Sequence, residues 1–125
     1  MIKFTAKGDY SKTRKFLKKL SSNDFYRNIE AMAQEGVDAL AEATPKDTGL
    51  TSESWTYSIA RTSTSLTITW TNSNFNKGVP IALLIQYGHG TRNGGYVSGV
   101  DYINPAMRPI FEKIEEYVLK EVGSE

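Results

Sequence analysis

The clearest pattern along the chain is an amphipathic rhythm between Asp24 and Ala43. The polar run from Ser21 to Asp24 is typical of a helix N-terminus, and Pro45 cannot continue a helix. The pattern therefore predicts a long helix over residues 24–43. Its apolar side chains fall on one face of that helix, and they are Phe25, Ile29, Met32, Ala33, Gly36, Val37 and Leu40.

A second helical stripe follows Asn104 and Pro105, because asparagine is a favourable N-cap and proline suits the first turn. It predicts a final helix over residues 104–122, with an apolar face made of Met107, Ile110, Phe111, Ile114, Tyr117, Val118 and Val122. A shorter helix is predicted from Asp9 or Ser11 to Leu20, with Phe16 and Leu17 facing inward.

Strict alternation marks two strands between these helices. Residues 54–59 and 65–70 alternate serine or threonine with aromatic and aliphatic residues, which is typical of a half-buried antiparallel hairpin. The connection at 61–64 contains no glycine, so we expect a loose loop and not a two-residue turn.

The pattern is weaker from residue 71 to residue 103. We expect a polar loop over 71–78, and residues 80–88 fit either a buried strand or a short helix, of which the composition favours the helix. Residues 88–99 contain five glycines and are expected to form a long, adaptable loop. Residues 96–103 are a candidate third strand.

This order of elements predicts an α+β fold, with long amphipathic helices packed on one face of a small antiparallel sheet that contains a β-hairpin. The 125 residues fit one domain. It divides into a basic N-terminal segment (1–20), a core (21–122) and a short tail (123–125).

The composition excludes several classes of site and of protein. The chain has no cysteine, so disulfides, thiol catalysis and thiolate metal sites are excluded. The longest apolar run, Val79 to Ile85, is far shorter than a membrane span needs, and the first residues lack the pattern of a secretory signal. We therefore expect no membrane partner.

The charge of the chain is unevenly distributed. The net charge is +1, yet residues 1–20 carry seven basic residues against one acidic residue. Such a basic end suits an acidic partner or non-specific contact with the phosphates of DNA, and it also fits a merely solvated face. Candidate interface residues are Lys12, Arg14, Lys15, Lys18, Lys19, Arg92 and Tyr96.

No constellation of catalytic residues is evident. His89 is the only histidine and lies between two glycines, where further metal ligands are scarce. The serines lie in caps, turns and strands, and the glutamates at 112, 115 and 116 fall on the outer face of the last helix. Residues 88–94 lack the Gly-Lys-Ser/Thr ending of a phosphate loop. We predict no enzyme activity, metal, cofactor or small-molecule substrate.

Three ordered motifs resemble the head–tail joining and tail-completion proteins of long-tailed bacteriophages. The first contains Pro45, Asp47, Thr48 and Gly49, with Leu50 directly after Gly49 where the family commonly has one residue between them. The second, over 86–91, contains Tyr87, Gly88, Gly90 and Thr91, with His89-Gly90 as an insertion. The third, over 102–107, contains Asn104 and Pro105. The similarity covers about residues 20–120.

The resemblance implies a non-catalytic structural protein of a phage or prophage virion, made in the host cytoplasm and assembled into a ring at the head–tail joint. Its partners would be copies of itself and connector, portal-side or tail-tube proteins. Relatives act as connectors, tail-completion proteins or tail terminators, and the motifs do not select among them. The loops at 72–78 and 88–99 are candidates for contacts with neighbouring copies. The alternative is a small DNA-associated or regulatory factor of a mobile element that acts through its basic N-terminal helix.

Overall fold

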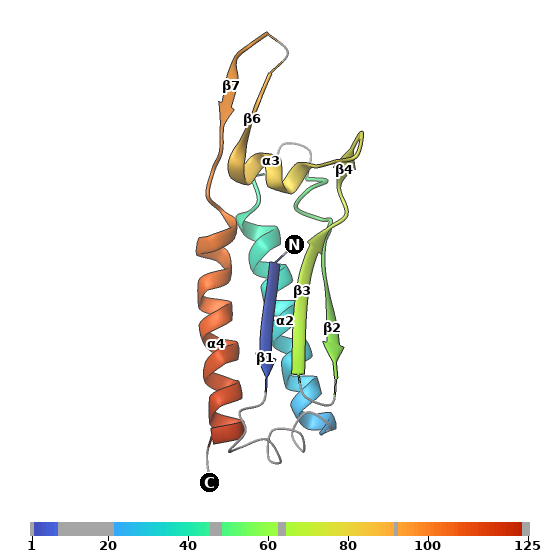
Figure 1. Ribbon diagram of the computed structural model, residues 1–125, viewed down its shortest axis with the longest axis vertical. Helices are drawn as coiled ribbons and strands as arrows, with labels where there is room; N and C mark the ends of the chain where they lie inside the picture. The colour runs from blue at the N-terminus through green and yellow to red at the C-terminus, as the bar shows by residue number, and fades with distance from the viewer. Residues whose placement is uncertain (1, 8–21, 46–48, 63–64, 92, 124–125) are drawn as a thin grey trace.

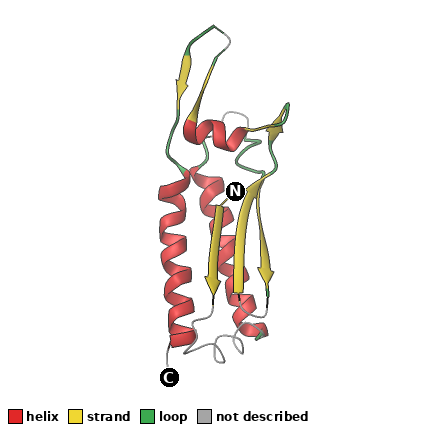
Figure 2. Cartoon of the chain, viewed as in Figure 1, coloured by secondary structure: helices red, strands yellow, loops and turns green. Residues whose placement is uncertain are grey.

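The computed structural model describes residues 2–7, 22–45, 49–62, 65–91 and 93–123, and its long axis follows two antiparallel helices (Figure 1). These are α2 (Asn23–Ala43) and α4 (Ile103–Gly123). Both helices lie on one face of a three-stranded antiparallel sheet, as the helices and strands of Figure 2 show. The predicted α+β architecture is therefore confirmed. Among the described residues, no helix combines the length and apolar character that a bilayer span requires.

The sheet has the order β1-β3-β2, from β1 (Ile2–Lys7), β3 (Ser65–Asn72) and β2 (Trp55–Arg61). Strands β2 and β3 are the predicted hairpin. Thr62 N donates to Ser65 O at 2.9 Å, so the strands stay paired closer to the turn than the expected loose loop would allow. Residues 63–64 lie outside the described residues.

The third strand comes from the N-terminus and not from residues 96–103 as expected. Phe4 pairs with Ile68 and Thr5 with Thr67, in antiparallel register. Alternation is present in residues 2–7, but their partner strand lies more than fifty positions away in the sequence, so local pattern gave no reason to pair them. The predicted helix ending at Leu20 lies outside the described residues.

The core lies between the sheet and the two helices. The predicted stripe of α2 is buried apart from the half-buried Val37, and the predicted stripe of α4 is buried at Met107, Ile110 and Ile114. Trp70 is fully buried, and its Nε1 donates to Ala33 O at 2.9 Å. A Cβ on Gly36 would lie 2.6 Å from Trp70 Nε1, so this helical glycine makes room for the indole.

Aromatic and polar contacts join the two helices along their length. The rings of Phe25 and Tyr117 stack with centroids 5.5 Å apart, and Asn28 Nδ2 donates to the Tyr117 hydroxyl at 2.9 Å. Lys113 forms a salt bridge of 2.8 Å with Glu35, but both groups are about half exposed, so it contributes little to stability. The helix pair is held mainly by its apolar stripe.

Short elements are gathered at one end of the molecule (Figure 1). They are β4 (Phe75–Asn76), β5 (Val79–Pro80), α3 (Ile81–Tyr87), β6 (Gly88–Gly90) and β7 (Tyr96–Ser98). We call this part the distal end, and we call α2, α4 and the three-stranded sheet the body. The predicted short helix over 80–88 is confirmed, with Gly88 directly after its last residue.

Two predicted loops are in fact small hairpins. The expected polar loop at 71–78 contains the end of β3 and strand β4, which pairs with β5 just beyond the loop. The turn residues Lys77 and Gly78 both have positive φ, as a tight two-residue hairpin turn requires. The expected glycine-rich loop at 88–99 contains the paired strands β6 and β7. Short strands without strong alternation carry too little local signal to be recognised from sequence.

Candidate functional site

The distal end is the candidate site because it is the part of the described chain that exposes most of its large apolar side chains. Helix α3 positions it. Ala82 is fully buried, its carbonyl accepts from the Tyr102 hydroxyl at 2.8 Å, and Ile85 O accepts from Val100 N at 2.8 Å. Burial raises the pKa of Tyr102 to about 12, so its hydroxyl remains a donor at neutral pH. These bonds fix α3 across the beginning of α4.

The side chain of Gln86 joins α3 to α4. Its Oε1 accepts from the backbone N–H groups of Tyr102 and Ile103, both at 3.0 Å, where α4 begins. The first N–H groups of a helix lack partners within the helix, so this amide satisfies two of them. Gln86 is buried, and the joint therefore takes the place of the usual local cap.

Asp101 completes this joint from the other side. Gln86 Nε2 donates to Asp101 Oδ1 at 2.7 Å, and Asn104 Nδ2 donates to the same oxygen at 3.0 Å. The hydrogen bond from Gln86, followed by those from Asn104, lowers the pKa of the Asp101 carboxyl. Asn104 was expected to cap the last helix, but α4 already begins at Ile103 and Asn104 is a donor to Asp101, so that expectation was wrong.

Beyond Gly88 the chain rises away from the body as an arm, which we define as residues 88–98 (Figure 1). Its base is very narrow. A Cβ on Gly88 would lie 2.5 Å from Val97 O, and a Cβ on Gly99 would lie 2.4 Å from Gln86 O. Gly88 also has a φ of +81°, which favours glycine. Because Gly88 and Gly99 have no Cβ, the two segments of the arm can pass close beside each other at its base.

The tip of the arm is closed by Thr91. Thr91 N donates to Gly95 O at 2.9 Å, and Gly95 N donates to Thr91 Oγ1 at 3.1 Å. Gly94 has positive φ here, whereas Gly90 lies in strand β6 opposite Tyr96. Arg92, a predicted interface residue, lies outside the described residues.

Apolar side chains at the distal end point outward. Tyr87 is 69% exposed and Tyr96 is 67% exposed, although the Tyr96 hydroxyl donates to Tyr87 O at 2.9 Å. Others with large exposure are Val97, Val100, Phe75, Val79 and Leu50. Sequence reasoning singled out Tyr96 as an interface residue and Tyr87 as a motif residue, but it missed the exposure of the others, because an isolated apolar residue in a loop gives no sign of which way it faces.

The described end of the first motif, at Gly49, also lies at the distal end of the molecule. Gly49 has a φ of +85°, and its carbonyl accepts from Ser52 Oγ at 2.9 Å and from Glu53 N at 3.1 Å. The turn is tied to the sheet because Asn72 Nδ2 donates to Thr51 O at 2.7 Å. Pro45 follows α2 as predicted. Asp47 and Thr48 lie outside the described residues.

His89 and the acidic side chains of the described residues do not form a metal site. His89 lies in β6 opposite Val97, and its Nδ1 is buried with no hydrogen-bond partner among the described atoms. Within the described ranges, no three His, Asp or Glu side chains are grouped to hold a metal ion. Pro105 is exposed in the first turn of α4, as predicted, and has no polar role.

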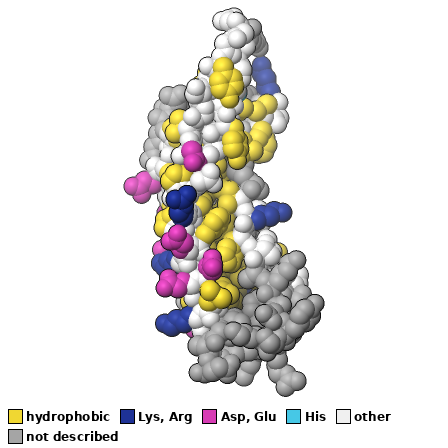
Figure 3. Space-filling view, turned by 60° about the vertical axis from the view of Figure 1, so that its left-hand side comes forward, with side chains coloured by type: hydrophobic (Ala, Val, Ile, Leu, Met, Phe, Trp, Pro, Cys, Tyr) yellow, Lys and Arg dark blue, Asp and Glu magenta, His cyan; other side chains and the backbone are white. Residues whose placement is uncertain are grey.

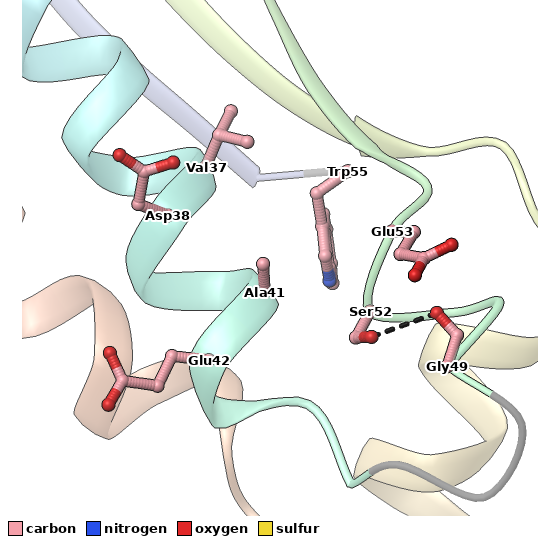
Figure 4. A pocket seen from close by; sticks show the side chains of 8 residues that line it. All are labelled: Val37, Asp38, Ala41, Glu42, Gly49, Ser52, Glu53 and Trp55. Carbon is pink, nitrogen blue, oxygen red and sulfur yellow. Dashed lines mark hydrogen bonds between the residues drawn. The ribbon is translucent and has the colours of Figure 1, made fainter.

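A shallow pocket lies between α2 and the segment that leads into β2. Figure 4 shows Trp55 standing between them, with the carboxylates of Asp38 and Glu42 directed away from it on one side and that of Glu53 on the other. The carboxylates therefore do not converge on a common point, as acid–base catalysis would require. The lining residues are Val37, Asp38, Ala41, Glu42, Gly49, Ser52, Glu53 and Trp55.

The predicted basic interface residues Lys12, Arg14, Lys15, Lys18 and Lys19 lie outside the described residues, so the distal end is the candidate surface that the geometry supports. It carries Tyr87, Gly88, Thr91 and Tyr96, and the turn that begins at Gly49 is hydrogen-bonded to the end of β3 through Thr51. No protein-family model, curated protein or solved structure matches the chain.

Proposed function

We propose that this protein is a non-catalytic structural subunit that assembles with copies of itself into a ring at the head–tail joint of a long-tailed phage or prophage. The observation that carries the proposal is the convergence of the three motifs at the distal end. Gln86, from the second motif, bonds directly to the backbone of Tyr102 and Ile103, at the start of the third. The first motif lies at the same end through Gly49 and Thr51.

The surface chemistry of this end suits assembly. Contiguous apolar surface of more than a few hundred Å² is uncommon on a monomer and marks interaction sites. The distal end exposes three aromatic side chains, Tyr87, Tyr96 and Phe75, each more than half accessible. A hydrogen-bonded scaffold holds them outward, which is the arrangement of a surface that binds another protein.

A ring of identical subunits uses two different surfaces on each copy, one to meet each neighbour. The protein would then act as a rigid spacer between the head and the tail, with other connector or tail-tube proteins above and below it. In this function the chain needs neither a cofactor nor a metal.

The test is the oligomeric state of the purified full-length chain. We expect native mass spectrometry and negative-stain electron microscopy to show closed rings of one stoichiometry, or rings that form with lysates of induced prophage strains. A chain that stays monomeric at all concentrations and is absent from purified virions would contradict the proposal. Salt-dependent retention of that monomer on DNA would instead support the DNA-associated alternative.

A further inference from the structure

The arm has almost no cover from its own chain. All described residues from Gly90 to Val100 are exposed, and the arm meets the rest of the molecule mainly through its narrow base. A two-stranded ribbon is only marginally stable in water when it has nothing to pack against. The arm therefore has both the shape and the energetic reason to lie on another surface.

The arm is also nearly free of charge. Apart from Arg92, residues 88–100 contain no Lys, Arg, Asp or Glu. Burying the described residues of the arm against a partner would thus leave no unpaired charge among them. Tyr96 on the arm and Tyr87 directly before it are each about two-thirds exposed, and together they present on the order of 250 Å² at the usual size of aromatic side chains. That is about a third of the roughly 800 Å² that one partner contributes to a stable interface.

A matching apolar surface lies on the same chain but on a different part of it. It runs along the side of the body where β1 meets α4, and we call it the apolar side. There the rings of Phe4 and Phe111 lie with centroids 6.1 Å apart, and both are only half-buried. Figure 3 shows hydrophobic side chains continuing from the distal end down the body, with acidic and basic side chains beside them. It comprises Ile2, Phe4, Ala106, Phe111 and Val118, which are partly buried because they also pack against the core.

We propose that the arm of one copy lies on the apolar side of a second copy of this chain. This inference rests on the proposed ring and specifies its contact. Both surfaces are apolar, they differ from each other, and one chain carries both. Such a pair forms a head-to-tail contact that repeats from copy to copy and closes a ring.

Cross-linking tests the contact directly, because the chain has no cysteine of its own. Two single variants, Val97→Cys on the arm and Glu115→Cys one turn from Phe111, are mixed in equal amounts and treated with a short bis-maleimide. We expect covalent dimers that join the two variants. The matched control replaces Glu115→Cys by Ser58→Cys on the outer face of the sheet, and it should give at least fivefold less product.

Equal yields with the control, or Val97→Cys dimers formed as readily without Glu115→Cys, would overturn the proposed contact. In that case intact rings would show that the chain assembles through other surfaces, so the proposed function would stand. Absence of any oligomer would contradict the proposed function itself.

A second experiment introduces a charged side chain into the arm and measures how assembly depends on protein concentration. Val97→Asp should raise the concentration at which half of the chain is assembled by about tenfold or more, since an unpaired carboxylate would be buried in the contact. Its thermal unfolding midpoint should match that of the unmodified protein. Ala60→Asp is the matched control, because Ala60 is exposed in β2 on the face of the sheet that points away from the helices. Equal assembly of the Val97→Asp variant and the unmodified chain would overturn the proposal.

Discussion

Different interactions stabilise the body and the distal end. In the body, apolar side chains fill the space between the sheet and the helices, and Trp70, Ile68 and Ile114 are completely buried. At the distal end the bonds between elements are largely polar, from Gln86 to the start of α4, from Tyr102 to Ala82 and from Asn72 to Thr51. Its large apolar side chains face outward instead.

Because of this difference, one region supplies the stability of the fold and the other supplies a surface for interaction. A hydrogen bond can fix an element in place without using up its apolar surface, whereas packing must bury that surface. The distal end therefore keeps Tyr87 and Tyr96 available for a partner, and the body supplies the free energy that keeps the chain folded. Substitutions in the two regions should consequently affect different measurements.

The largest effect is expected in the centre of the body. Ile114→Ala should lower the free energy of unfolding by about 2–5 kcal/mol, because it removes buried methyl groups and leaves a cavity. Val97→Ala on the arm should change it by no more than about 0.5 kcal/mol. Urea denaturation of both variants measures the difference. Similar losses would show that the arm is packed as firmly as the body.

Gly36→Ala tests the close approach of α2 and Trp70. Alanine favours helix, yet its Cβ would meet the indole at 2.6 Å, so we expect a net loss of about 2–3 kcal/mol from overpacking. In a Trp70→Phe background the added methyl group has more room, and the same substitution should cost clearly less. Additive effects in this double-mutant cycle would mean that the two residues are not in contact.

Gln86→Ala tests the polar joint between the two regions. It removes the acceptor of two backbone N–H groups and should cost about 1–2 kcal/mol. Amide hydrogen exchange should become faster in residues 81–103 and stay unchanged in the centre of α2. The exposed Gln34→Ala is the control and should alter neither. Uniform acceleration over the whole chain would show that the distal end does not move as a separate unit.

The smallest effect concerns Asp101. Its carboxyl has a folded-state pKa below the ordinary value of 3.8, owing first to the hydrogen bond from Gln86. The stability that it adds is therefore present above that ordinary value and is lost as the pH falls through the lower folded-state value. Asp101→Asn should abolish this dependence, so the melting temperatures of the two proteins should converge below about pH 4. A constant difference down to about pH 2 would contradict the role of the carboxylate.

Long elements with a strong period were predictable. Helix α2, the stripe of α4 and the β2–β3 hairpin each repeat one rhythm over many residues, so the buried face can be read from the sequence. The short helix α3 was also predicted, from Pro80 before it and Gly88 after it. Strand β1 was missed because its only reason to form is pairing with β3, more than fifty residues further along.

The candidate site was predictable only in part. Residues 72–78 and 88–99 were expected to carry contacts, and they do form the exposed distal end, but as ordered hairpins. The function of Gln86 was not predicted, since a glutamine in a helix gives no sign that its amide reaches the start of another helix. The function of Gly88 and Gly99 depends likewise on which strands pass beside them.

The long helices, the hairpin, their buried faces and the absence of cysteine chemistry all follow from the amino-acid sequence. These properties depend on periodicity and composition, and both are local. The position of β1, the direction of the arm and the outward orientation of Tyr87 and Tyr96 arise only in the folded chain. Those features arise from contacts between segments far apart in the chain, and their free energy exists only once the segments have met.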